Sequence, residues 1–298
     1  MPNFFILIIF ICFNMHANII SPIPQSMPTD EKKVALGKLL FNDTRLSVDN
    51  TISCASCHLL NEGGDDNKSV STGVNGLKGE LNSPTVFNSV FNFKQFWDGR
   101  ADNLKEQALG PILNPIEMGN NFDTLIVKLE KTEYLNIFNN IYLDGITQDN
   151  IVDAISEYEK TLITPNSDFD MYLKGDTNAI TQVQKEGYAI FKEKGCISCH
   201  HGINIGANLY SKLGVIIDPS ISHLGMTNKD KEEKFKVPSL RNVAKTAPYL
   251  HNGSIKTLNE TVKTISLYQL GRELKDDEIY KIVKFLESLN GKIKEERK

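Results

Sequence analysis

The stretch SCASCHLL at residues 53–60 has a near copy, GCISCHHG, at residues 195–202. Each contains the pattern Cys-x-x-Cys-His, in which two thiols lie on one side of a helical turn and a histidine follows directly. Thiols at this spacing can add to the two vinyl groups of a haem, and the histidine can then bind the iron. The repeat therefore predicts two covalently attached c-type haems, one in each half of the chain.

Each copy of the pattern supplies two attachment thiols and one axial ligand of a haem iron. These six residues are Cys54, Cys57, His58, Cys196, Cys199 and His200. A zinc site built from the four cysteines would leave both histidines unexplained. A thioredoxin-like redox pair needs a βαβ setting, and neither copy follows a strand-like run. Haem attachment is therefore the favoured interpretation.

Length and composition describe a globular protein. A chain of 298 residues is long enough for two domains of typical size. Its 40% hydrophobic and 23% charged residues are typical of a folded protein that does not span a membrane. A net charge of −4 disfavours nucleic acid as a partner and suits docking of a basic protein.

The N-terminus carries an apolar run over residues 4–13, which is too short for a bilayer and typical of the core of a signal peptide. We predict a signal peptide over residues 1–20, with Ala17 as a plausible cleavage position and an uncleaved anchor as the alternative. The fifth cysteine, Cys12, lies in this leader. Because c-type haem is attached outside the cytoplasm, we expect a periplasmic protein.

The remaining chain has a helical pattern interrupted by long loops. Apolar residues recur at three-to-four spacing, which predicts helices over residues 34–41, 122–133, 149–162, 181–191, 257–268 and 276–289. Thr147 and Asp149 are predicted to cap one of these helices, and Asp276 is predicted to cap another. Sustained two-residue alternation does not occur, so we expect little sheet.

The segment 164–176 separates two halves that each contain one haem pattern. The predicted fold is mainly α, with two cytochrome c-like domains that each bind one covalently attached haem. The N-terminal domain is predicted over residues 28–165 and the C-terminal domain over residues 166–298.

Four further segments resemble the bacterial di-haem cytochrome c peroxidases. They are FWDGRADNLKEQALGPILNPIEMG (96–119), EKTLITPNSDFD (159–170), FKVPSLRNVAKTAPYLHNG (235–253) and YQLGRELKDDEI (268–279). In that family the N-terminal haem reacts with hydrogen peroxide, and the C-terminal haem receives electrons from a small c-type cytochrome or cupredoxin. The resemblance therefore implies a cytochrome c peroxidase that reduces hydrogen peroxide to water. Because relatives often dimerise, it also implies a homodimer.

The resemblance assigns roles near the N-terminal haem. Glu117 matches the acid on the peroxide-binding side, Gln107 matches a polar partner in the same pocket, and Trp97 matches the aromatic residue between the two haems. Splitting peroxide requires a group that takes a proton from one oxygen and delivers it to the departing one. A buried carboxylate whose pKa is raised toward neutrality can do this.

A calcium ion is a further implication of the resemblance. Asn82, Thr246 and Pro248 match positions that hold calcium between the domains, the last two through backbone oxygen. Calcium takes roughly six to eight oxygen ligands, so these three residues would supply only part of the set.

Val74 departs from the family pattern. Many members carry a histidine at this position, which binds the N-terminal haem iron and must leave before peroxide can bind. Here the residue is valine, and the sequence has no histidine between His58 and His200. We therefore expect an N-terminal iron that is open or water-bound when both haems are oxidised, and an enzyme that needs no reductive activation.

A second departure concerns the sixth ligand of the C-terminal haem. Peroxidases of this family usually have a methionine where this chain has Ile265. Met226 and Tyr268 are the candidate replacements, and an empty sixth position is the alternative.

Two other functions stay open at this point. One is a di-haem electron carrier without catalysis. The other is an oxidase of a protein side chain, like the related di-haem enzyme that matures a tryptophan-derived quinone, which ligation by Tyr268 would favour. Glu117 and Gln107 beside an unblocked haem favour the peroxidase.

Overall fold

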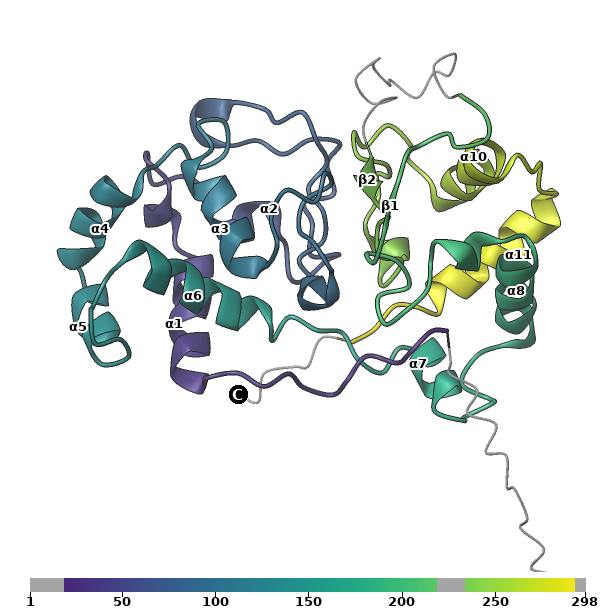
Figure 1. The fold of residues 1–298 in the computed structure, drawn as a ribbon, viewed down its shortest axis with the longest axis horizontal. Coiled ribbons are helices and arrows are strands. Elements are labelled where there is room, and N and C mark those ends of the chain that lie inside the picture. The colour runs from purple at the N-terminus through teal and green to yellow at the C-terminus, as the bar shows by residue number, and fades with distance from the viewer. Residues whose placement is uncertain (1–18, 219–233, 293–298) are drawn as a thin grey trace, which may run out of the picture.

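The computed structural model describes residues 19–218 and 234–292, and its regular structure is mainly helical (Figure 1). The longer helices are α1 (Glu31–Phe41), α3 (Leu104–Leu113), α4 (Phe122–Glu130), α6 (Gln148–Glu159), α8 (Gln182–Glu193), α10 (Leu258–Leu270) and α11 (Asp276–Glu287). The shorter helices are α2 (Cys54–Cys57), α5 (Tyr134–Asn139) and α7 (Asp168–Leu173). Strands β1 (Tyr210–Ser211) and β2 (Phe235–Lys236) pair antiparallel. The prediction of a mainly α fold with little sheet is confirmed.

Each of the six predicted segments contains a helix, although the ends differ by several residues. In the segment predicted over residues 122–133, helix α4 ends at Glu130, and a separate helix, α5, follows it. Thr147 caps α6, because its side chain accepts a hydrogen bond from the backbone of Asn150 at 3.1 Å. The predictions that Asp149 and Asp276 are caps were wrong. Asp149 lies in the first turn of α6, and Asp276 is the first residue of α11, whose cap position Lys275 occupies. Within the described ranges, no helix combines the length and apolarity that a bilayer span requires.

Each half has its own hydrophobic core, and the two cores use the same packing device. In the N-terminal half α1 packs on α6, and a Cβ at Gly37 would overlap the carbonyl oxygen of Ala154. In the C-terminal half α8 packs on α11, and a Cβ at Gly187 would overlap the carbonyl oxygen of Lys281. A glycine in the first helix of each pair therefore allows the two backbones to touch. The two halves therefore share a pair of closely packed helices as well as a haem pattern.

Residues 19–30, here named the arm, run along both halves before α1 begins (Figure 1). Ile20 is 1% exposed within the C-terminal core, and Gly202 donates its backbone N–H to the Ile19 oxygen at 2.8 Å. At the other end Asp30 caps α1, because its side chain accepts from two backbone N–H groups of the first turn. Ile19 and Ile20 are therefore part of the folded body. Cleavage after Ala17 would keep them, whereas cleavage after residue 20 would remove them.

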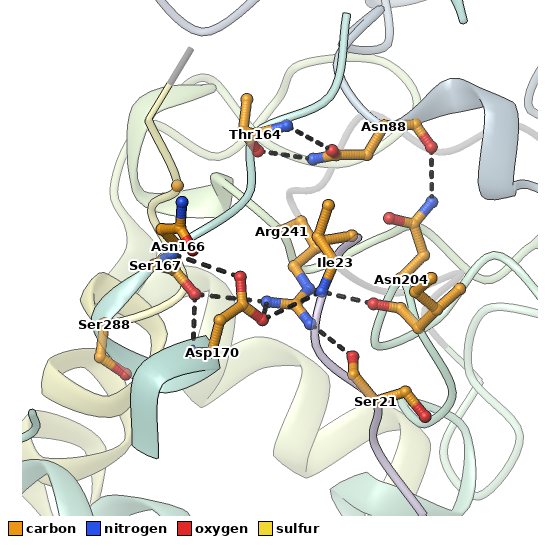
Figure 2. A network of polar contacts seen from close by, with 12 residues as sticks. Ser21, Ile23, Asn88, Thr164, Asn166, Ser167, Asp170, Asn204, Arg241 and Ser288 are labelled. Atoms are coloured by element: carbon orange, nitrogen blue, oxygen red, sulfur yellow. Dashed lines mark hydrogen bonds and ion pairs between the residues drawn. The ribbon is translucent and has the colours of Figure 1, made fainter. Parts of the chain in front are cut away.

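A buried ion pair ties the arm to the C-terminal half (Figure 2). Arg241 and Asp170 are 1% and 0% exposed, and Nη1 of Arg241 lies 2.6 Å from Oδ1 of Asp170. Nη2 of Arg241 donates to the carbonyl oxygen of Ser21 at 2.8 Å, and the backbone N–H of Ile23 donates to Asp170 at 3.3 Å. Both charges are therefore paired with each other and with the arm.

Two asparagines join the halves beside this ion pair (Figure 2). The side chain of Asn88 exchanges two hydrogen bonds with Thr164, each 2.8 Å long. Asn204 of the C-terminal half donates to the backbone oxygen of Asn88 at 3.0 Å. These buried contacts hold the loops that carry the two haem patterns in a defined relative position.

Candidate functional site

The N-terminal half encloses a cavity of about 420 Å³, here named the N-terminal cavity. Cys54, Cys57 and His58 line it, and both thiols are free. The short helix α2 forms because the backbone N–H of Ser53 donates to Ser56 Oγ at 3.0 Å while the N–H of His58 donates to the Cys54 oxygen at 3.0 Å. This turn brings the two thiols to one side, as the spacing predicts. Burial raises the pKa of both thiols.

The C-terminal half contains a second cavity, of about 270 Å³, here named the C-terminal cavity. Cys196, Cys199 and His200 line it, and both of these thiols are also free. Its walls are largely apolar and include Val262 and Ile265 of α10.

The predicted iron ligands are oriented in the same way in both halves. Nδ1 of His58 lies 3.0 Å from the carbonyl oxygen of Gly64, and Nδ1 of His200 lies 3.2 Å from that of Ile205. Because a carbonyl only accepts, Nδ1 carries the proton in each ring and Nε2 is left for a metal. Burial lowers the pKa of both imidazoles, which keeps them neutral as ligation requires.

The described residues therefore fit a covalently attached haem in each cavity. Each cavity brings together two thiols that form no disulfide and one neutral imidazole with a free Nε2, on short helical turns that backbone hydrogen bonds hold. Gly206 permits this arrangement in the C-terminal half, since a Cβ at that position would overlap the carbonyl oxygen of Pro238 and lie 3.1 Å from Nδ1 of His200.

Glu117 and Gln107 line the N-terminal cavity together with His58. Nδ2 of Asn114 donates to Oε1 of Glu117 at 2.7 Å, which fixes the carboxylate. Burial raises the pKa of Glu117, and the hydrogen bond from Asn114 opposes the shift. This is the environment expected for a carboxyl group that exchanges protons.

Val74 is buried beside this cavity and lies outside its described lining. The backbone N–H of Val74 donates to the backbone carbonyl oxygen of Glu117 at 2.9 Å. Its side chain packs on Gly119, where an added Cβ would lie 3.2 Å from Cγ2 of the valine. Val74 is thus packed behind the cavity lining, against the backbone of Glu117 and Gly119.

The candidates for a sixth ligand of the second haem lie in different places. Ile265, at the family's methionine position, lines the C-terminal cavity. Tyr268 packs in a separate cluster with Tyr249 and Ile255, outside the described lining of that cavity. Met226 lies outside the described residues.

Trp97 lines both cavities. Its Nε1 donates to the carbonyl oxygen of Asn82 at 2.8 Å, and its own oxygen accepts from the backbone N–H of Lys236 at 2.7 Å. The His251 ring lies edge-on to the indole with centroids 6.5 Å apart and stacks on Phe235 at 4.5 Å. A packed set of rings therefore fills the wall between the two cavities.

Four charged residues that line the N-terminal cavity are not among the predicted site residues: Glu80, Arg100, Glu159 and Lys236. Arg100 lines the cavity and lies over the Phe96 ring, with its guanidinium carbon 3.5 Å from the ring centroid. Glu159 is 5% exposed, and burial raises its pKa to about 8. The sequence carries a sign of this burial, because Glu159 follows Ile151 and Ile155 at four-residue spacing on α6.

The predicted calcium residues lie near an acid without a partner. Asn82, Thr246 and Pro248 line the C-terminal cavity. Both carboxylate oxygens of Asp65 are buried and lack a hydrogen-bond partner among the described residues. A Cβ at Gly63 would overlap both Oδ1 of Asp65 and the backbone carbonyl oxygen of Lys245. The Asp65 carboxylate therefore faces the segment that contains Thr246. Sequence reasoning missed Asp65, although it stands in the pair of aspartates after the first haem pattern.

Comparison with known proteins agrees with this geometry. Residues 31–178 match the family model described as Di-haem cytochrome c peroxidase, and residues 184–290 match the model described as Cytochrome c. "Cytochrome c peroxidase Ccp" of Escherichia coli (strain K12) is 52% identical over 91% of this chain, which spans 61% of that protein's length. "Cytochrome c551 peroxidase" of Nitrosomonas europaea is 44% identical over 91% of this chain and 84% of that protein. The crystal structure of a MauG-like protein associated with microbial copper homeostasis is similar with a TM-score of 0.76 and 25% identity, and the match covers 94% of this chain and 95% of that one.

Proposed function

Because the chain belongs to the di-haem cytochrome c peroxidase family, we propose that it reduces hydrogen peroxide to water with electrons from a small c-type cytochrome or cupredoxin. The observation that carries this proposal is the placement of Glu117 in the same cavity as His58 and two free thiols. An electron carrier has no use for a buried acid at such a position.

The two cavities would each hold one haem c. The residues proposed to hold them are Cys54, Cys57 and His58 in the N-terminal cavity and Cys196, Cys199 and His200 in the C-terminal cavity. When bound, haem supplies the redox chemistry that breaks the oxygen–oxygen bond. The protein supplies attachment, orientation and proton transfer.

Glu117 is proposed to move the proton. Its carboxylate takes a proton from one peroxide oxygen and delivers it to the other, so that water can leave. Burial favours this exchange, because it raises the pKa of Glu117 and makes the carboxylate a better base. Asn114 holds one carboxylate oxygen, and Gln107 offers an amide in the same cavity to orient the peroxide.

Trp97 is proposed to lie on the path of electrons from the C-terminal to the N-terminal cavity. Its support is that the indole lines both cavities and is held at both its Nε1 and its backbone oxygen. The donor, the periplasmic location and a homodimer rest on the resemblance and on the leader in the sequence.

We also propose that the enzyme needs no reductive activation. Val74 is packed behind the lining of the N-terminal cavity, and no histidine stands between His58 and His200. The holoprotein should therefore oxidise a reduced small cytochrome c without a lag, and reduction of the C-terminal haem beforehand should not raise the rate. Electron paramagnetic resonance of the fully oxidised protein should show one high-spin haem.

Two outcomes would contradict this proposal in different ways. Low-spin signals from both oxidised haems, with a lag that prior reduction abolishes, would refute activation-free turnover and leave the peroxidase standing. Turnover no faster than that of free haem would favour the electron carrier. The position of Tyr268 outside the C-terminal cavity does not favour the side-chain oxidase.

We propose that calcium binds between the halves, at Asn82, Thr246 and Pro248, with Asp65 as an additional acidic group. The two unpartnered oxygens of Asp65 support this, since a buried carboxylate without a partner is costly. Calorimetry of the chelator-treated holoprotein should detect one calcium per chain. Asp65→Asn should weaken binding by about tenfold or more through loss of ligand charge, while Asp123→Asn on exposed α4 should not. Absence of binding to the parent protein would refute the site.

A further inference from the structure

Lys236 occupies the wall that the two cavities share. It lines both of them, and of the described residues that do so it alone carries a charge. Its backbone is held on two sides, by pairing with Tyr210 across β1 and β2 and by the hydrogen bond from its N–H to the Trp97 oxygen. The position of this residue between the cavities is therefore defined by the fold.

Lys236 is a buried residue whose ammonium group has no partner among the described residues. The residue is 7% exposed, and no ion pair or side-chain hydrogen bond joins it to another residue in the described part of the chain. Burial is the only influence on its pKa, which falls to about 8, so no nearby carboxylate supports the charge. The neighbouring β2 residue Phe235 stacks on His251 and offers no acceptor at its ring.

A buried ammonium without a counter-charge is costly, and proteins rarely keep one unless something pairs with it. Each haem carries two propionate carboxylates, either of which could supply the negative charge that pairs with the Lys236 ammonium group. The carboxylates of the N-terminal cavity do not supply this negative charge. Glu117 and Glu159 line that cavity but leave the pKa of Lys236 unaffected.

We infer that Lys236 binds a propionate carboxylate of bound haem at the shared wall and acts as a positioning residue for both haems. This inference rests on the proposed function, since it requires a haem in each cavity. A positive charge in the wall shared by the two cavities would disfavour the ferric state of a haem bound in either one. Lys236 therefore raises both reduction potentials together and links their values to one side chain.

Redox titration of the purified holoprotein, followed by visible spectra of the two haems, tests this inference. Lys236→Met should lower the equilibrium constant for reduction of both haems on the order of tenfold, which is about 59 mV for a one-electron couple. Lys236→Arg keeps the charge and should restore both potentials. Lys256→Met removes the same charge from an exposed position and should leave both potentials unchanged.

Haem content separates the inference from the proposed function. Two haems per chain with unchanged potentials in Lys236→Met, or a shift of only one haem, would overturn the shared role and leave the peroxidase standing. A parent chain that takes up no haem would overturn the proposed function itself. If Lys236→Met does not accumulate, Lys236→Gln provides the same comparison with a polar, uncharged side chain.

Discussion

Glu117→Gln is expected to lower kcat/KM for hydrogen peroxide by a factor on the order of 10² to 10⁴, the usual contribution of a positioned acid or base. Glutamine has the same shape and can still accept the hydrogen bond from Asn114, so the cavity should be unchanged while proton transfer is lost. Steady-state oxidation of reduced cytochrome c at varied peroxide concentration measures the effect.

The pH dependence gives an independent check on this assignment. Glu117 must be ionised to take a proton, so the parent rate should rise as the pH rises through the pKa of Glu117, which burial places above its usual value. The glutamine variant should lose this limb of the profile. Glu130→Gln, at the exposed end of α4, is the matched control. A Glu117→Gln enzyme with near-parental rate and pH profile would show that another group moves the proton.

Arg241→Met is expected to lower the free energy of unfolding of the holoprotein by about 3–5 kcal/mol. The substitution removes one partner of a fully buried ion pair and leaves the Asp170 carboxylate without a counter-charge. It also removes the hydrogen bond from the guanidinium to the Ser21 oxygen, so the arm loses one of its attachments. Denaturant unfolding followed by circular dichroism measures the change.

A double-variant cycle shows whether the loss comes from the pair. Asp170→Asn in the Arg241→Met background should cost much less than Asp170→Asn alone, because the uncompensated charge has then already been created. Lys284→Met, which breaks an exposed pair with Glu287, should leave the unfolding midpoint almost unchanged. Equal losses in Arg241→Met and in this control would refute the structural role of the buried pair.

The sequence predicts the parts of this fold that depend on local pattern. Both haem patterns are visible because attachment chemistry requires adjacent residues, and the longer amphipathic helices are visible because their apolar faces repeat. Helix α3 escaped prediction because Pro111 lies inside it, and proline usually ends a helix. Helix α7, only six residues long, gives too short a pattern.

Sites assembled from distant segments could not be predicted in this way. Glu117 and Trp97 became candidates only through resemblance, since a lone loop acid is usually solvated and a lone tryptophan usually belongs to a core. Asp65 stands in a polar segment, and Lys236 stands between Phe235 and Val237, where a lysine is usually solvated. Both are buried because loops from the two halves close over them, which is a property of tertiary structure.

The arm makes the C-terminal half depend on residues that precede the N-terminal half in the chain. Ile20 is packed in the same cluster as Phe285 and Leu289, so a residue near the start of the described range completes the core of the C-terminal half. A fragment that begins after residue 165 would expose this part of its core to water and would leave Arg241 without the Ser21 carbonyl. The two cytochrome-like halves are thus not interchangeable modules, because the core of the second is complete only when the arm lies against it.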